Sequence, residues 1–194
     1  MKKIITLGTI FILALLIGSC KKGEDDPFFS LHTRKARLAG DWKMTEGKIT
    51  IGIKDSTGAY ASQIYELTED GYKYSVTGTG ANFQRKASLN LSITKKGVIT
   101  INQVMDSVSI ESSGTWDFLG KVGENKNKET ISIRLSDFNN QSDLFRTFNK
   151  GTTNFMYHIK ELRNKRMVLE NKEEMILLKN GIGVYITSQY TFVQ

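Results

Sequence analysis

Residues 38–54, LAGDWKMTEGKITIGIK, contain two alternating runs of apolar side chains that are out of phase with each other. Trp42 and Met44 occupy even positions, and after Gly47 the isoleucines occupy odd positions. Side chains of a strand alternate between its two faces, so one face stays apolar only if an extra residue shifts the register. The stretch therefore predicts one long strand with a β-bulge or a bend near Gly47.

The same two-residue alternation recurs along the chain between short turn sequences. A clear case is ETISIRLSDF, in which Ile131, Ile133 and Leu135 alternate with polar residues. Asp70-Gly71, between two alternating runs, is typical of a hairpin turn. We expect nine or ten strands in succession, an all-β fold. Their order favours an antiparallel up-and-down β-barrel of about eight to ten strands, because closure leaves no exposed sheet edge.

Two segments depart from this alternation. Residues 30–38 predict a short N-terminal helix with Ser30 as its cap. Residues 139–153 carry Phe145 and Phe148 at helical spacing, which indicates a short helix or a lid over one end of the barrel.

The first twenty residues have the features of an export signal, in the right order. Lysines at the start precede a mostly apolar run from Ile4 to Ser19, and Cys20, the single cysteine of the chain, follows directly. A helix of that run would rise about 24 Å, short of the roughly 30 Å hydrocarbon core of a bilayer. We expect a signal peptide at residues 1–19. An ordinary signal peptide, or a short membrane anchor with a chance cysteine, is the alternative.

The sequence Ile17-Gly18-Ser19-Cys20 resembles the lipobox of bacterial lipoproteins. The resemblance implies that the Cys20 sulfur carries a diacylglycerol, that the chain is cut before it, and that the new amine is often acylated. One acyl chain gives only marginal attachment, about 0.8 kcal/mol per buried CH₂, so two or three are needed. Residues 20–29 are then the lipidated cysteine and a charged, flexible tether. That tether resembles either a surface-export signal or a plain linker.

The body of the chain, residues 30–194, resembles the lipocalin-like lipoproteins of Gram-negative bacteria. The resemblance rests on Gly40-Asp41-Trp42 after the predicted helix, on GTWDFLG at residues 114–120, and on the lipobox upstream. It implies a lipocalin-like barrel that often holds a small apolar or amphipathic ligand. It also implies a location in the cell envelope, as an outer membrane lipoprotein. Typical members pack a last-strand arginine on the tryptophan, but the final stretch GVYITSQYTFVQ has no arginine.

Composition and motifs argue against several other functions. The chain has 27 basic and 20 acidic residues spread along its length, and we expect an exported protein of this kind to have no nucleic-acid partner. His32 and His158 lie far apart in the sequence with no obvious partner. Catalysis and metal binding need clustered ligands or an oriented base, so we expect no enzyme, no metal and no cofactor.

Aromatic residues on the predicted apolar faces, with the two phenylalanines of the lid, are the candidate ligand-binding residues. They are Trp42, Tyr65, Tyr74, Trp116, Phe118, Phe145, Phe148 and Tyr157. Two interpretations stay open. In the first, these side chains line a cavity for a small hydrophobic ligand. In the second, they fill the barrel core, and the membrane-anchored protein docks on an envelope protein partner.

Overall fold

The computed structural model describes residues 32–55, 57–120, 128–136, 154–177 and 182–194. Within these ranges, ten strands follow one short helix. The elements are α2 (Arg34–Leu38), β1 (Gly40–Lys54), β2 (Tyr60–Thr68), β3 (Gly71–Val76), β4 (Asn82–Ile93), β5 (Val98–Met105), β6 (Val108–Phe118), β7 (Thr130–Leu135), β8 (Asn154–Leu162), β9 (Arg166–Leu177) and β10 (Gly183–Val193). Cys20, Phe145 and Phe148 lie outside the described residues.

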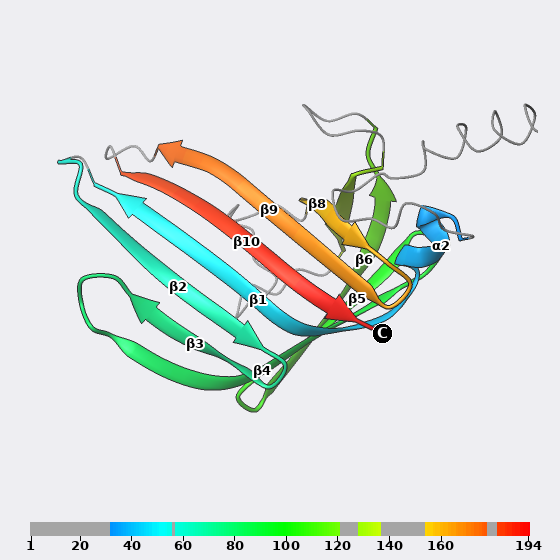
Figure 1. Ribbon diagram of the computed structural model, residues 1–194, viewed down its shortest axis with the longest axis horizontal. Coiled ribbons are helices and arrows are strands. Elements are labelled where there is room, and N and C mark those ends of the chain that lie inside the picture. Colours follow the sequence, from blue (N-terminus) through cyan, green and yellow to red (C-terminus); the bar gives the residue numbers. More distant parts are fainter. Residues whose placement is uncertain (1–31, 56, 121–127, 137–153, 178–181) are drawn as a thin grey trace, which may run out of the picture.

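The strands form a closed antiparallel barrel in which each strand pairs with its neighbours in the chain (Figure 1). Pairing of β1 with β10 closes the ring. The predicted fold class, an all-β up-and-down barrel of eight to ten strands after a short helix, is confirmed. Successive strands can pair in this way because tight turns join most of them, as at the β2–β3 hairpin.

The β-bulge expected in the first strand is present. Met44 pairs with Phe192 of β10, and Glu46 pairs with the adjacent Thr191, so Thr45 is the extra residue. The apolar side chains on both sides of the bulge are buried. The bulge therefore turns both alternating runs of the strand toward the same core.

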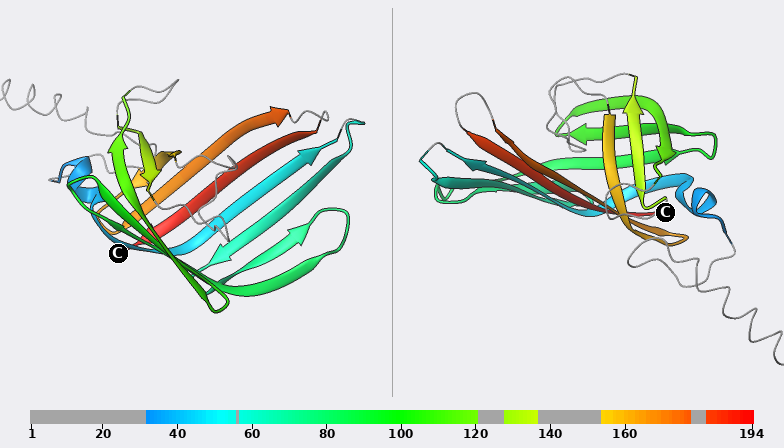
Figure 2. Two further views of the ribbon diagram at one scale, coloured as in Figure 1. Left: turned by 180° about the vertical axis from the view of Figure 1, so that it is seen from behind. Right: turned by 90° about the horizontal axis from the view of Figure 1, so that it is seen from above.

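β1 also changes partner beyond the bulge. Its residues 40–43 pair with β4, whereas its residues 46–54 pair with β2. The β2–β3 hairpin is thus inserted between β1 and β4, and the long strands run away from α2 as one curved sheet (Figure 2). We call the part near α2, where β1 pairs directly with β4, the closed end. The flange is the part formed by β2, β3, residues 46–54 of β1, residues 82–87 of β4 and residues 183–190 of β10.

Large apolar side chains pack the closed end. Those that are at most 1% exposed there include Leu38, Trp42, Leu91, Ile99, Phe155, Leu162, Met167 and Phe192. Burial of each such side chain contributes about 1.5–3 kcal/mol. The core and the strand pairings of the described residues all lie between residues 38 and 193. Residues 21–194 therefore contain what holds this barrel together.

The cap of α2 differs from the prediction. The Thr33 hydroxyl accepts a hydrogen bond from the Ala36 amide at 3.2 Å, so Thr33 is the N-cap and not Ser30. Both residues have a short hydroxyl side chain suited to this position, and the sequence pattern did not distinguish them.

α2 is fixed to the closed end by its basic residues. The guanidinium of Arg37 donates to the carbonyl of Leu162, and that of Arg34 donates to the carbonyl of Ile159 at 3.4 Å. Lys35 places its Nζ 5.7 Å from the centre of the Trp116 ring, a cation–π distance. The helix thus supplies a cation to Trp116, whereas typical members of the family resembled here pack a last-strand arginine on the tryptophan of the G-x-W motif.

Candidate functional site

Six of the eight candidate aromatic residues lie within the described ranges, and they fall into two groups. The closed-end group is Trp42, Trp116, Phe118 and Tyr157. The flange group is Tyr65 and Tyr74. Trp42, Trp116 and Tyr157 are buried, whereas Phe118, Tyr65 and Tyr74 are half-buried.

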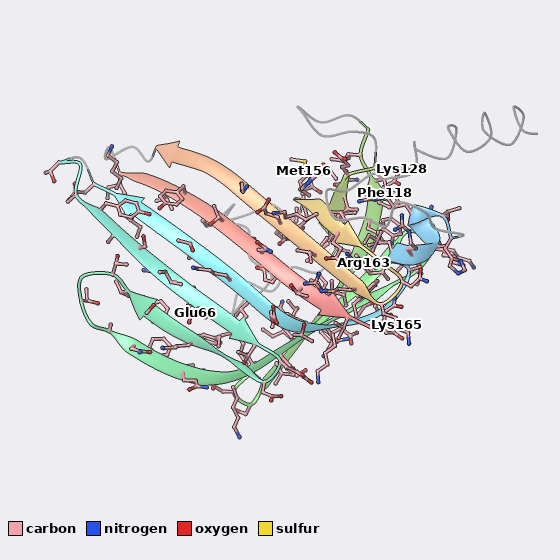
Figure 3. The ribbon with its side chains drawn as sticks, in the orientation of Figure 1. Glu66, Phe118, Lys128, Met156, Arg163 and Lys165 are labelled. Atoms are coloured by element: carbon pink, nitrogen blue, oxygen red, sulfur yellow. The ribbon has the colours of Figure 1, made fainter. Side chains whose placement is uncertain are left out.

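The closed-end group is part of the packed core. Trp42 is 1% exposed and donates from Nε1 to the Leu38 carbonyl at 2.9 Å. Trp116 donates from Nε1 to the Thr94 carbonyl at 3.0 Å and meets Phe118 edge to face, with ring centres 5.4 Å apart. Figure 3 labels Phe118 near α2. Both indole N–H groups are thus satisfied by the protein itself.

Tyr157 lies deeper in the same core. It is fully buried, and its ring meets that of Tyr190 edge to face at 6.1 Å. Tyr190 is also fully buried and comes from β10. Trp42, Trp116 and Tyr157 are therefore buried in the core, Tyr157 against Tyr190 of the flange, and Phe118 packs half-buried against the same core.

The flange group belongs to a larger aromatic cluster, which consists of Tyr65, Tyr72, Tyr74 and Phe83. Ring centres are 4.9 Å apart for Tyr65 and Tyr74, and 4.6 Å apart for Tyr74 and Phe83. Strand register explains this contact, because Tyr65 pairs with Tyr74 across β2 and β3, and Tyr74 pairs with Phe83 across β3 and β4. Tilted aromatic pairs at these distances stabilise one another beyond their burial alone.

Burial within the aromatic cluster is incomplete. Tyr72 is buried, Tyr65 and Tyr74 are half-buried, and Phe83 is 43% exposed. The rings form one continuous apolar surface on the same side of the sheet as the core. Such a surface offers an apolar molecule more contact area than single scattered side chains do.

Sequence reasoning missed Phe83. It stands in NFQRK, where polar and charged residues surround it and no alternating apolar pattern marks the strand. Only its cross-strand pairing with Tyr74 reveals its role. That pairing depends on the length of the turn between β3 and β4, which composition alone does not indicate.

A cation lies beside the exposed edge of the aromatic cluster, but it already has a partner. The guanidinium carbon of Arg85 is 5.5 Å from the centre of the Phe83 ring. Arg85 also donates to the Asp106 carboxylate at 2.7 Å, and this hydrogen bond raises the pKa of Arg85. The Asp106 carboxylate therefore offsets this positive charge, and an anionic ligand would have to compete for it.

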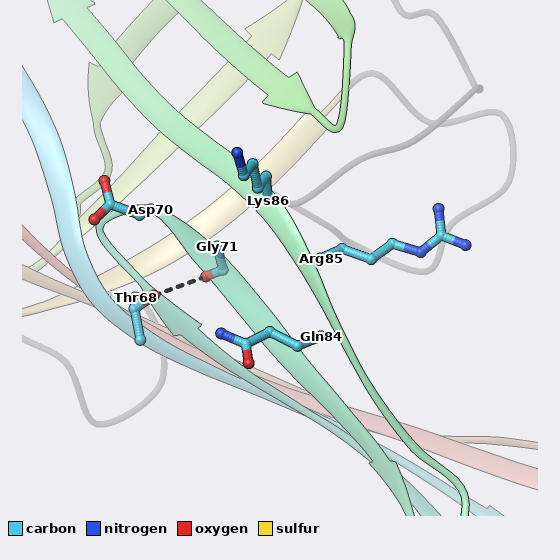
Figure 4. A pocket seen from close by; sticks show the side chains of 6 residues that line it. All are labelled: Thr68, Asp70, Gly71, Gln84, Arg85 and Lys86. Carbon is cyan, nitrogen blue, oxygen red and sulfur yellow. Dashed lines mark hydrogen bonds between the residues drawn. The ribbon is translucent and has the colours of Figure 1, made fainter.

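A hollow of about 730 Å³ lies outside the core, at the β2–β3 turn (Figure 4). Its lining includes Thr68, Asp70, Gly71, Gln84, Arg85 and Lys86. The Thr68 hydroxyl donates to the Gly71 carbonyl at 3.2 Å, and the Arg85 and Lys86 side chains extend in different directions. This lining is polar and charged, so it suits water better than an apolar ligand.

Within the described ranges, no group of three His, Cys, Asp or Glu residues is placed to hold a metal ion. His32 is exposed and His158 is half-buried on β8. Among the same residues, no helix has the length and apolar character needed to cross a membrane.

Comparisons of the chain with protein-family models, with curated proteins and with solved structures gave no match. Within the described residues, the aromatic cluster is the feature with the clearest chemical character. It combines contiguous rings, partial exposure and a position on the inner side of the sheet.

Proposed function

We propose that this protein is a membrane-anchored, lipocalin-like lipoprotein that binds a small apolar or amphipathic molecule on the aromatic cluster of its flange. The observation that carries the proposal is the contrast in burial between the two aromatic groups. At the closed end Trp42 is 1% exposed, whereas Phe83 in the aromatic cluster is 43% exposed. Covering a partly exposed apolar surface with a ligand is favoured by about 25 cal/mol per Å² of apolar area.

The ligand would lie against the core side of β2, β3 and β4 and not at the closed end. The large side chains of the closed end named above are at most 1% exposed, so they offer a ligand almost no exposed apolar area, whereas Tyr74 and Phe83 are partly exposed. On the flange, Tyr65 and Tyr74 can contact a ligand with their ring faces. Binding is then by enclosure and stacking, with no chemical step.

Attachment to the membrane is proposed from the lipobox. Acyl chains on Cys20 would hold the barrel in the cell envelope, as an outer membrane lipoprotein, at the end of the tether of residues 20–29. The substitution Cys20→Ser tests this directly. It should abolish labelling by a radioactive fatty acid and block the cut before residue 20, and unchanged labelling would contradict the anchor.

The alternative is an envelope accessory protein that has a filled core, takes no small ligand and docks on another envelope protein. The dense packing of the closed end favours it. The large exposed apolar residues do not add support, because Tyr60, Val108 and Met156 lie on strands that do not pair with one another. Isolated exposed apolar residues are ordinary in soluble proteins and do not form a docking patch.

Native mass spectrometry of residues 21–194, exported to the periplasm and purified without denaturation, separates the two functions. We expect a discrete extra mass that detaches on activation. The double variant Tyr74→Ala/Phe83→Ala should lose it, whereas Met156→Ala, a change at an exposed apolar residue outside the aromatic cluster, should retain it. A bare mass for the unmodified protein, with no uptake of a fluorescent lipid, would favour the accessory function.

A further inference from the structure

The cross-strand row that begins in the aromatic cluster continues beyond it. Phe83, Tyr74 and Tyr65 pair in succession across β4, β3 and β2. Tyr65 then pairs with Ile49 of β1, and Ile49 pairs with Ser188 of β10.

One further step completes the row, because Ser188 pairs with Asn171 of β9. We call these six residues the inner row. Strands lie about 4.8 Å apart, so the four steps from Phe83 to Ser188 span about 19 Å. The inner row thus runs from a partly exposed aromatic end to a polar end.

Ser188 is the unusual member of the inner row. It is 2% exposed, and its Oγ has no hydrogen-bond partner among the described residues. Its neighbours with the same orientation on β10, Ile186 and Tyr190, are buried core residues. A buried hydroxyl without a partner is unfavourable, and an alanine at this position would avoid that penalty. A ligand could therefore supply the hydrogen-bond partner that the Ser188 hydroxyl lacks among the described residues.

Asn171 extends the polar end. Its Nδ2 donates to the Met156 carbonyl at 3.0 Å, which fixes the orientation of the amide and leaves Oδ1 as an acceptor beside the row. Asn171 is itself 9% exposed. The polar end thus presents a hydroxyl, able to donate and accept, next to a carbonyl-type acceptor.

No member of the inner row carries a charge. Arg85 lies at the opposite, aromatic end, where it is bonded to Asp106. A carboxylate or phosphate held at Ser188 would be buried without a cation from the row, which is strongly unfavourable. A neutral hydroxyl or carbonyl group meets no such penalty.

We propose that the inner row binds an elongated, uncharged amphiphile whose apolar body lies on the aromatic cluster and whose hydroxyl or carbonyl end reaches Ser188. Ile49 and Ser188 are each 2% exposed, so the polar end enters only when the groups that cover them move aside. A ligand hydroxyl would donate to Asn171 Oδ1 and accept from Ser188 Oγ. This inference rests on the proposed function and names the class of ligand that the flange would take.

The test compares two probes that differ only in the head group, dodecan-1-ol and dodecanoate, as competitors of Nile red on delipidated residues 21–194. Above neutral pH, where dodecanoate is ionised, we expect the alcohol to bind more tightly. Ser188→Ala should weaken binding of the alcohol about five- to tenfold, the effect of one hydrogen bond. The same substitution should raise the melting temperature of the unliganded protein, because it removes an unpaired buried hydroxyl.

Thr187→Ala is the matched control, because Thr187 is the next residue of β10 and faces the opposite side of the sheet. It should leave the preference for the alcohol unchanged. Equal or tighter binding of dodecanoate would overturn the inference that the ligand is uncharged, and so would an unchanged affinity of Ser188→Ala for the alcohol. Either result would still be compatible with the proposed binding of an apolar or amphipathic ligand. If neither probe nor Nile red binds, the proposed function and this inference are both overturned.

Discussion

The closed end and the flange are built from the same strands but use their apolar faces differently. At the closed end, β1 pairs directly with β4, and α2 is hydrogen-bonded to β8. Trp42 and Trp116 are buried there, with their indole N–H groups bonded to backbone carbonyls. On the flange the inserted β2–β3 hairpin widens the sheet, and the rings of Tyr74 and Phe83 remain partly exposed. One alternating pattern therefore gives a packed core in one region and a contact surface in the other.

The largest expected difference between the two regions is in stability. Trp42→Ala should lower the free energy of unfolding by about 3–5 kcal/mol, because it leaves a cavity in a packed core. Phe83→Ala should lower it by less than about 1 kcal/mol, because the ring is partly exposed. Urea unfolding followed by circular dichroism measures both. Equal losses would remove the distinction between the closed end and the flange.

The next largest difference in stability is expected between substitutions of two glycines, Gly114 and Gly52. A Cβ on Gly114 would lie 2.1 Å from the backbone oxygen of Arg134, so Gly114→Ala must separate β6 from β7 and should cost about 2 kcal/mol. A Cβ on Gly52, in the flange, would instead meet the ring of Tyr185, which can rotate away from its stacking partner Tyr60. Gly52→Ala should therefore cost less in the same urea experiment. A larger loss for Gly52→Ala would show that the flange is as tightly packed as the closed end.

An ion-pair network at the closed end should have an intermediate effect. Glu161 is buried, forms an ion pair with Arg163, whose Nε lies 2.8 Å from Glu161 Oε1, and accepts a hydrogen bond from Arg166. Glu161→Gln removes the negative charge that both arginines share and should cost about 1–2 kcal/mol, since both arginines are half-exposed.

The exposed pair Lys43–Glu69 provides the control for that substitution, and Glu69→Gln should change the midpoint of thermal unfolding less. The comparison is made by calorimetry at low salt. Equal shifts would mean that burial of Glu161 adds nothing to its pairing.

The smallest expected effect is at the tip of the flange. Asp55 accepts hydrogen bonds from the Thr57 hydroxyl at 2.7 Å and from the Ala59 amide at 2.9 Å. The hydrogen bond from Thr57 and, to a smaller extent, those from backbone amides lower the pKa of Asp55. The stabilising contribution is therefore present above the unfolded-state pKa and is lost as the pH falls through the lowered, folded-state pKa. In Asp55→Asn the melting temperature should fall slightly less at acid pH than in the unmodified protein. Identical pH profiles of the melting temperature for the two proteins would contradict this role of Asp55.

Much of the fold could be predicted from the sequence, because alternation of apolar residues directly reflects the geometry of a strand. The change of phase between Met44 and Ile49 predicted that the strand has a bulge, but the extra residue is Thr45, two positions before the expected Gly47. The switch of β1 from β4 to β2 could not be predicted, because register between distant strands depends on loop lengths and packing. The roles of Phe83 and Ser188 could not be predicted for the same reason. Their neighbours in the sequence are mostly polar, and their neighbours in space come from other strands.

The most direct test of the account is a titration of ¹⁵N-labelled residues 21–194 with dodecan-1-ol, followed by NMR. The two tryptophans of the chain, Trp42 and Trp116, both belong to the closed end, so their indole N–H signals report on that region alone. We predict shifts of the backbone amide signals of Tyr65, Tyr74 and Ser188, with the two indole signals unchanged. Shifts of the indole signals while the flange stays unchanged would place the ligand at the closed end and contradict the account.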